Sequence, residues 1–189
     1  QHVEAPVQHG VRARNESADD GVELYRKLRL PNPEEIGFRY PHQVSGGQLQ
    51  RAMTAMAMAC RPDLIIFDEP TTALDVTTQI EVLAAIREIV DAPLYAPRHA
   101  RAMLRARGLD AGMRKFEPFQ RIGIGPLEVE PFPMHHSIPD AMGLILHTDA
   151  GVVVHTGDFR IDPEEPAPGL ERLRKLGDRG VDLLLSDST

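Results

Sequence analysis

Residues 44–75 read V-S-G-G-Q-L-Q-R-A-M-T-A-M-A-M-A-C-R-P-D-L-I-I-F-D-E-P-T-T-A-L-D, and this stretch decides the fold class. Two glycines and a glutamine open a predicted helix, whose N–H groups and dipole suit anionic phosphate oxygens. The apolar run 64–67 is typical of a buried parallel strand. Asp68 and Glu69 follow it, at the strand end where open α/β sheets bind their ligands. The pattern predicts an α/β fold and nucleotide chemistry.

The apolar spacing predicts a helix on each side of this strand. The first spans Gly47 to Cys60 and ends at Arg61-Pro62-Asp63, and the second spans Val76 to Val90. Apolar stripes at helical spacing far more often pack in a core than contact a cofactor. The predicted core faces are Leu49, Met53, Met56 and Ala57 on the first helix, and Ile80, Leu83, Ile86 and Val90 on the second.

At these residues the chain resembles the ATP-binding subunits of ABC transporters, most closely those of peptide importers. Residues 44–48 match the signature loop of that family, 64–69 its Walker B strand, and 73–75 its D-loop. A lone S-G-G or a lone D-E is common. The three segments in this order and spacing make the resemblance specific.

The resemblance implies a role for each matching residue. Asp68 is expected to hold Mg²⁺, and Glu69 to act as the catalytic base that polarises the attacking water. The expected ATP-binding residues are Ser45, Gly46, Gly47, Gln48 and Asp75. In this family the signature loop acts on nucleotide held by a partner, so the implied partners are a second ATPase subunit and membrane permease subunits.

Two parts of that machinery do not occur in the sequence. There is no G-x-x-x-x-G-K-[ST] phosphate loop (Walker A). His99 is a poor match for the family's switch histidine. Pro97 interrupts the strand that would carry it, and too few residues of sequence separate it from Asp75. We therefore expect an incomplete ATP-binding subunit.

Composition bounds the remaining possibilities. The net charge of −7 is shared as −4 over residues 1–90 (9 basic, 13 acidic) and −3 over 91–189 (12 basic, 15 acidic), so neither half as a whole predicts a polyanion-binding surface. Cys60 is the single cysteine, which excludes an internal disulfide and fits a reducing compartment. No apolar run is long enough to span a membrane. A cytoplasmic protein is expected, peripheral at the inner face of the cell membrane if it serves a transporter.

The character of the sequence changes at Val90-Asp91. We expect residues 1–21 to be irregular, 22–90 to be a partial ABC ATPase domain that starts with a helix at 23–30, and 91–189 to be a second α/β piece. Periodicity and turn signals in the second piece predict helices at 100–107 and 170–176, and strands at 124–132, 142–148, 152–156 and 181–185, with a hairpin turn at 149–151.

Two polar clusters follow strands of this second piece. They are M-H-H-S-I-P-D at 134–140 and T-G-D-F at 156–159. Imidazole and carboxylate are ligands that Zn²⁺ accepts, and a carboxylate can bridge two ions. A His-His pair alone is weak evidence, because most such pairs are solvated or satisfied by hydrogen bonds.

Together with P-L-Y-A at 93–96, H-T-G-D-F-R at 155–160 and the closing L-L-L-S-D-S-T, these segments look like the metallo-β-lactamase fold nucleases of the ribonuclease J type. The resemblance implies a partial αββα sandwich that acts on RNA, with His136 as a Zn²⁺ ligand and Asp158 as the bridging carboxylate. His135 is expected to be incidental, and His147 and His155 structural. The H-x-H-x-D-H cluster of that family is absent.

Three functions remain open at this stage. The chain is an ATP-binding and ATP-hydrolysing subunit of a peptide importer, a zinc-dependent RNA hydrolase, or an inactive composite that joins a truncated P-loop-type nucleotide-binding piece to a partial metallo-hydrolase. The ATPase interpretation has the longest run of matching motifs. Exposed sheet edges and apolar faces are expected in either piece, because each lacks neighbouring strands.

Overall fold

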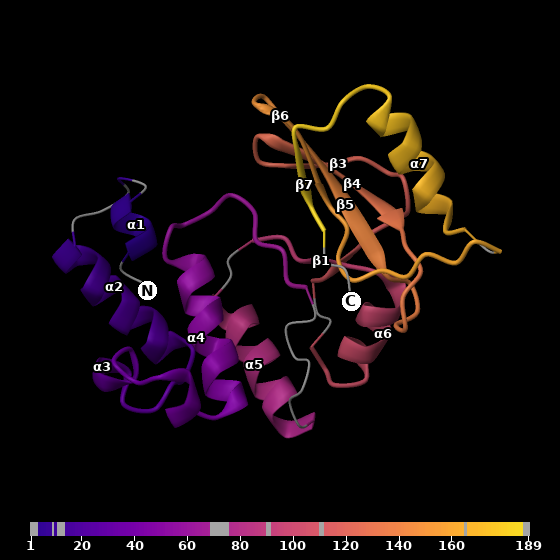
Figure 1. Cartoon of the computed structure of the whole chain (residues 1–189). Coiled ribbons are helices and arrows are strands. Elements are labelled where there is room, and N and C mark those ends of the chain that lie inside the picture. The colour runs from indigo at the N-terminus through magenta and orange to yellow at the C-terminus, as the bar shows by residue number, and fades with distance from the viewer. Residues whose placement is uncertain are drawn as a thin grey trace. The chain divides into compact units, whose positions relative to one another are not determined.

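The computed structural model describes residues 4–8, 10, 14–68, 76–89, 92–109, 112–164 and 166–186. The chain forms two compact units, Gln1–Ala92 and Pro93–Thr189 (Figure 1). The division lies two residues beyond the change of character at Val90-Asp91. Each unit has an apolar core of its own.

The N-terminal unit contains only helices among its described residues. They are α1 (Glu4–Gln8), α2 (Arg14–Lys27), α3 (Pro33–Ile36), a 3-10 helix η1 (Pro41–Gln43), α4 (Gly46–Met58) and α5 (Val76–Ile89). The predicted helices at 47–60 and 76–90 correspond to α4 and α5. The described residues of the segment 1–21 are not irregular as predicted, because they form α1 and the first half of α2, where Pro6 and Ser17 are buried. The helix predicted at 23–30 is the last part of α2, which ends at Lys27.

The strand predicted at 64–67 is wrong. These residues are half-buried but have no regular secondary structure. A strand needs a neighbour to pair with its N–H and C=O groups, and the described part of this unit supplies none. Here the apolar run therefore indicates partial burial but does not indicate a β-strand.

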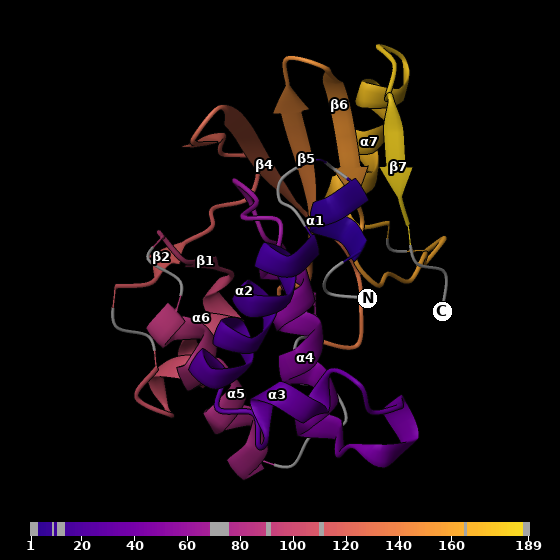
Figure 2. The ribbon, with the colours of Figure 1, turned by 90° about the vertical axis from the view of Figure 1, so that its left-hand side faces the viewer.

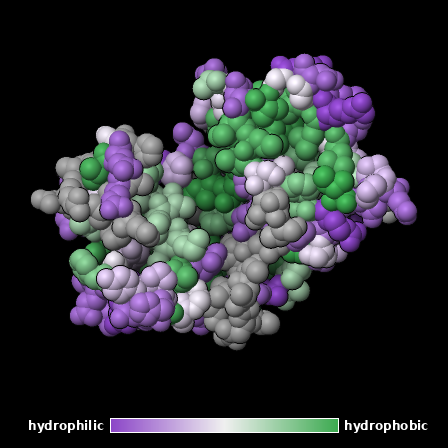
Figure 3. Space-filling model, viewed as in Figure 1, coloured by the Kyte–Doolittle hydropathy of each residue, from purple (hydrophilic) through white to green (hydrophobic). Residues whose placement is uncertain are grey.

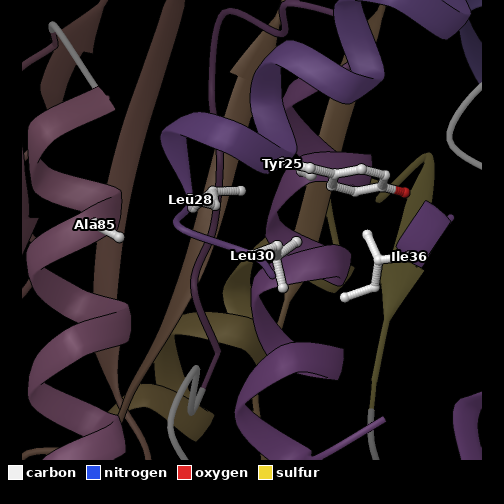
Figure 4. Packing of buried hydrophobic residues seen from close by; sticks show 6 residues of the cluster. Tyr25, Leu28, Leu30, Ile36 and Ala85 are labelled. Carbon is white, nitrogen blue, oxygen red and sulfur yellow. The ribbon is translucent and has the colours of Figure 1, made fainter. Parts of the chain in front are cut away.

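The core of this unit lies where α2 and the turn after it meet α3, α4 and α5. Leu28 is fully buried and Leu30 nearly so. Figure 4 shows Tyr25, Leu30 and Ile36 beside one another, with Leu28 on the side nearest Ala85 of α5. The turn after α2 thus places two leucines in the core, and neither of them belongs to a helix.

The face of α4 that packs in this core differs from the predicted one. Leu49 and Met53 are 37% and 53% exposed, whereas Thr54 and Ala55 are buried. Small residues are favoured on the inner face because α2 and α5 both pack against α4 there. Hydrophobicity alone predicted that the longer side chains face the core. Because the helices approach closely, smaller side chains occupy that face instead.

The C-terminal unit is built on a five-stranded sheet in the order β3-β4-β5-β6-β7. The strands are β3 (Ile122–Ile124), β4 (Leu127–Pro133), β5 (Met142–Thr148), β6 (Gly151–His155) and β7 (Leu183–Leu185). A short parallel pair, β1 (Tyr95–Ala96) and β2 (Arg114–Lys115), is accompanied by α6 (Arg98–Arg105), and α7 (Pro168–Gly177) connects β6 to the parallel strand β7.

Most sequence predictions for this sheet are confirmed. The strand at 142–148 has its predicted bounds, and the turn at 149–151 joins it to β6 as an antiparallel hairpin in which Thr148 faces Gly151. The strand expected at 124–132 is instead two strands. Gly125, with a φ of 55°, and Pro126 form a tight turn there that folds β3 back on β4.

Helix α7 covers one face of the sheet, as Figures 1 and 2 show. Phe132, Ile145 and Val154 of the sheet are buried beneath it and form one cluster with Leu176 of the helix. The helix approaches so closely that a Cβ added at Gly169 would lie 2.1 Å from the carbonyl oxygen of Pro133. Only glycine permits this approach, so Gly169 sets the spacing between helix and sheet.

The last strand is exposed at the edge of the sheet. Leu183, Leu184 and Leu185 are 50%, 58% and 45% exposed. Figure 3 shows apolar side chains gathered over the sheet region of this unit. The predicted apolar strand and the expected exposed edge are both confirmed here.

Candidate functional site

The predicted phosphate-facing loop is the N-terminus of α4. Ser45 is the N-cap residue in extended conformation, and its Oγ accepts a hydrogen bond from the Gln48 N–H at 3.3 Å. In return, Gln48 Oε1 accepts from the Ser45 N–H at 3.0 Å. This reciprocal capping box fixes where the helix begins.

The capping box leaves backbone donors at the helix end. Among the described residues, the N–H groups of Gly46 and Gly47 have no hydrogen-bond acceptor; Ser45 and Gly46 are exposed, whereas Gly47 is buried. Free N–H groups and the helix dipole together favour an anion at this position. The structure thus brings together four of the five predicted ATP-binding residues, Ser45, Gly46, Gly47 and Gln48.

The predicted carboxylates are described only in part. Asp68 follows the half-buried segment 64–67 and is exposed. Glu69 and Asp75 lie outside the described residues. Their roles as catalytic base and nucleotide contact therefore remain predictions, as does the role of Asp68 toward Mg²⁺.

The second predicted pair, His136 and Asp158, does lie close together. Nε2 of His136 is 3.9 Å from Oδ2 of Asp158, and both side chains are mostly buried. The Arg160 N–H donates to the His135 carbonyl oxygen at 2.7 Å and so ties the two loops to each other. On the other side of the imidazole, Ser137 Oγ is 3.4 Å from Nδ1.

This pair is not a complete metal site. In the described part of the chain, no group of three or more His, Cys, Asp or Glu side chains is placed to hold a metal ion. A stable zinc site needs three or four protein ligands. The residues present therefore do not fit a tightly bound dinuclear centre.

The other histidines of this region have structural partners, as the sequence predicts. His155 Nδ1 accepts a hydrogen bond from the Gly157 N–H at 3.2 Å. His147 Nε2 lies 3.4 Å from Oε2 of Glu130. His99 lies in the first turn of α6 and is half-buried.

Glu130 is the centre of a charged cluster that sequence reasoning missed. Its side chain is 5% exposed and accepts two hydrogen bonds from Arg172 of α7, one of them from Nη2 at 2.8 Å. Arg121 Nε donates to it at 3.2 Å. The bonds from Arg172, followed by those from Arg121 and His147, lower the pKa of Glu130 to about 2 against the opposing effect of burial.

This cluster connects α7 to β4 across 42 residues of sequence. Arg172 carries a correspondingly raised pKa because of the same bonds. The one available signal was a glutamate at the centre of the apolar strand L-E-V-E-P-F-P, which requires a buried cation. Sequence spacing gave no indication of which arginine supplies it.

Comparison with known proteins bears on the N-terminal unit. Residues 4–72 match the family model described as ABC transporter. A probable peptide ABC transporter ATP-binding protein of Sinorhizobium fredii is 48% identical over 91 residues, which are 48% of this chain and 27% of that protein. The dipeptide transport ATP-binding protein DppD of Haemophilus influenzae is 46% identical over 89 residues, covering 47% and 27%.

A third relative, the glutathione import ATP-binding protein GsiA of Escherichia coli, is 47% identical over 79 residues, which are 42% of this chain and 13% of that protein. The chain thus spans about a quarter or less of the relatives it matches. A solved structure of a protein of unknown function from Enterococcus faecalis V583 gives a TM-score of 0.41 at 18% identity, over 52% of this chain and 26% of that one. That likeness is too small to define the fold.

The resemblance predicted from residues 44–75 is therefore confirmed for the N-terminal part. Residues 4–72 match the ABC transporter family model, and the relatives that the chain resembles are ATP-binding proteins of such transporters. The family match ends before the C-terminal unit, so the predicted likeness of that unit to metallo-β-lactamase fold nucleases stays a prediction.

Proposed function

We propose that the N-terminal unit serves in an ATP-binding and ATP-hydrolysing subunit of an ABC transporter of the peptide import type. The observation that carries this proposal is the N-terminus of α4, where a capping box holds Ser45 and Gln48 and leaves the N–H donor of the exposed Gly46 available. That helix end lies within residues 4–72, which match the ABC transporter family model. Such a subunit works with a second ATPase subunit and permease subunits at the inner face of the membrane.

Within this function each residue has a defined task. The glycine N–H groups and the Ser45 hydroxyl donate hydrogen bonds to the terminal phosphate of nucleotide held by the second subunit. Glu69 accepts a proton from the attacking water, and Asp68 is the residue that would hold Mg²⁺, which neutralises phosphate charge when bound. Asp75 contacts the nucleotide from the D-loop. Among the described residues no helix is long and apolar enough to cross a bilayer.

The test is complementation in trans. The full chain is mixed with a dipeptide transport ATP-binding protein that keeps its own phosphate loop but whose signature serine is replaced by arginine, and phosphate release from ATP is measured. We expect this chain to restore hydrolysis and its Ser45→Arg variant to fail. Ser137→Arg, in the C-terminal unit, is the matched control and should restore hydrolysis fully.

Absence of any restored hydrolysis with the unaltered chain overturns the proposal and favours an inactive composite. Restoration by Ser45→Arg as well as by the unaltered chain also overturns it, because the signature loop is then not responsible.

A second candidate function, zinc-dependent RNA hydrolysis by the C-terminal unit, is favoured by one observation. His136 and Asp158, far apart in the sequence, lie 3.9 Å from each other. Equilibrium dialysis against Zn²⁺ tests it. Retention of at least one ion per chain that is lost in His136→Ala and unchanged in His99→Ala supports this function, and retention below one ion per chain at micromolar Zn²⁺ rejects it.

A further inference from the structure

Strand β7 forms one border of the sheet of the C-terminal unit. The strand order places β6 on one side of it and, among the described residues, no strand on the other, as Figure 2 shows. The Leu185 carbonyl oxygen accepts a hydrogen bond from the Thr156 N–H at 3.0 Å, so it points toward β6. Successive residues of a strand direct their N–H and C=O groups to opposite sides. The N–H and C=O groups of Leu184, at the centre of β7, therefore point to the open edge.

The three leucines of β7 extend the apolar rows of the sheet beyond the helix that covers it. By register, Leu184 continues the row of Ile145 and Val154 on the face under α7. Those two residues are buried, whereas Leu184 is 58% exposed, so α7 does not cover β7. Leu183 and Leu185 lie on the other face and are also exposed. Both faces of the strand therefore present apolar surface at the open edge.

Strand β7 lacks the features that protect many edge strands from pairing. Such edges commonly carry a lysine, a proline or a charge, but residues 183–185 are all leucine. The adjacent charge, Asp182, is held toward β6. Its Oδ2 accepts from the Val152 N–H at 2.7 Å, and its own N–H donates to the Val152 carbonyl oxygen at 3.0 Å. The open edge can therefore accept another strand without burying this carboxylate.

A second copy of β7 matches this edge when the two strands run antiparallel about a two-fold axis at Leu184. The Leu184 N–H of each copy then donates to the Leu184 carbonyl oxygen of the other, which is the bonding pattern of an antiparallel pair. Leu183 lies opposite the other copy's Leu185, so leucine meets leucine on both faces. Asp182 lies opposite Ser186. Parallel pairing in register would instead place Asp182 opposite its own copy, where like charges repel.

We propose that the C-terminal unit binds a second copy of this chain through β7, so that the two sheets join into one continuous sheet. Two hydrogen bonds between the Leu184 residues and the burial of the leucines of both copies stabilise the contact. Because β7 has three residues, the interface is small, and small interfaces are typical of weak, transient association. A monomer–dimer equilibrium that depends on protein concentration follows. This proposal stands apart from the ATP-binding proposal.

The experiment is disulfide cross-linking of the full chain in a Cys60→Ser background, read on non-reducing gels after mild oxidation. Leu184→Cys should cross-link readily, because Cα atoms of a hydrogen-bonded antiparallel pair lie about 5.5 Å apart, within the reach of a disulfide. Leu183→Cys alone should cross-link about tenfold more slowly, because its two copies lie about 8 Å apart across the axis. An equal mixture of Leu183→Cys and Leu185→Cys chains should cross-link readily, since those positions are opposite.

The matched control is Ile161→Cys in the same background. Ile161 is 61% exposed, close to the 58% of Leu184, so this variant measures cross-linking by random collision. Each substitution replaces an exposed side chain and leaves both cores intact. Sedimentation velocity of the unaltered chain from low to high micromolar concentration gives an independent measure, and the average sedimentation coefficient should rise with concentration.

Two results overturn the proposal. Cross-linking of Leu184→Cys no faster than that of Ile161→Cys, together with a monomer at every concentration, leaves the edge to a strand of a different protein. Equal cross-linking of the Leu183→Cys, Leu184→Cys and Leu185→Cys chains, each alone, excludes the two-fold antiparallel register and indicates parallel pairing instead.

Discussion

The two units of this chain are stabilised in different ways. The N-terminal unit closes helices over aliphatic and aromatic side chains around Leu28, and its ion pairs, such as Arg29 with Glu88, are exposed. The C-terminal unit combines an apolar core under α7 with Glu130, a buried carboxylate that holds Arg172. Exposed ion pairs contribute little, whereas breaking a buried one is costly. We therefore expect the stability of the C-terminal unit, unlike that of the N-terminal unit, to depend strongly on one buried charge.

The units also differ in what their sequences reveal. The first matches the predicted family over residues 4–72, yet its described residues do not form the predicted strand. The family match does not extend into the second, yet the strands and hairpin of that unit follow the sequence closely. Specific motifs therefore do not guarantee a correct local structure, and regular alternation predicts structure without revealing function.

The largest effects are expected from emptying either core. Phe132→Ala should lower the free energy of unfolding by about 3–5 kcal/mol, and Leu28→Ala by about 2–5 kcal/mol, because each removes a fully buried side chain and leaves a cavity. Hydrogen exchange measured by mass spectrometry should rise in β4–β6 for the first variant and in α2–α5 for the second. Equal increases in both units for either variant would contradict separate cores.

Removal of the buried carboxylate of Glu130 tests whether the C-terminal unit depends on a buried charge. Glu130→Gln should destabilise the C-terminal unit by about 3 kcal/mol, since Arg172 then stays partly buried without a counter-charge. Urea unfolding gives the value. Glu128→Gln is the control, because Glu128 is 58% exposed and pairs only with Arg121, and a change within about 0.5 kcal/mol is expected there.

The same residue predicts how stability depends on pH. Its pKa in the folded protein is about 2, below the ordinary value of 4.5. The stabilisation is therefore fully present above about pH 5 and is lost as the pH falls toward 2, an effect of about 3 kcal/mol. Urea unfolding at pH 6, 4 and 3 should show this decline for the unaltered chain and a weaker one for Glu130→Gln. Parallel declines would show that other carboxylates are responsible.

A smaller effect is expected at the cap of α4. Ser45→Ala removes the acceptor of the Gln48 N–H and should cost about 1 kcal/mol of stability in the N-terminal unit. Ser45→Asp retains a capping oxygen and should cost much less. Thermal unfolding followed by circular dichroism compares them, and equal melting temperatures for the two variants would show that the cap does not stabilise α4.

The smallest change in stability is expected at the sheet edge. Leu184 is 58% exposed, so Leu184→Lys should alter the free energy of unfolding by no more than about 0.5 kcal/mol. A charge on an edge strand opposes pairing with another chain. Analytical ultracentrifugation should show less self-association than for the unaltered chain, and unchanged association would mean that β7 is not where chains meet.

The sequence by itself determined the features that depend on neighbouring residues. The capping box at 45–48, the hairpin turn at 149–151 and the alternation in β5 are local, because a few adjacent residues fix the backbone and its hydrogen bonds. The motif at 44–75 likewise identified the relatives of the N-terminal part. The resemblance of the second piece of the sequence placed His136 and Asp158 in one predicted site, and the two side chains do lie close together in the structure.

Only the tertiary structure decided the features that join distant residues. It selected Thr54 and Ala55, not Leu49 and Met53, for the inner face of α4, because neighbouring helices leave space only for small side chains. It left residues 64–67 without a strand partner and chose Arg172 as the cation for Glu130. The physical reason is common to all three. Burial and pairing depend on what approaches from elsewhere in the chain, and neither periodicity nor composition records that partner.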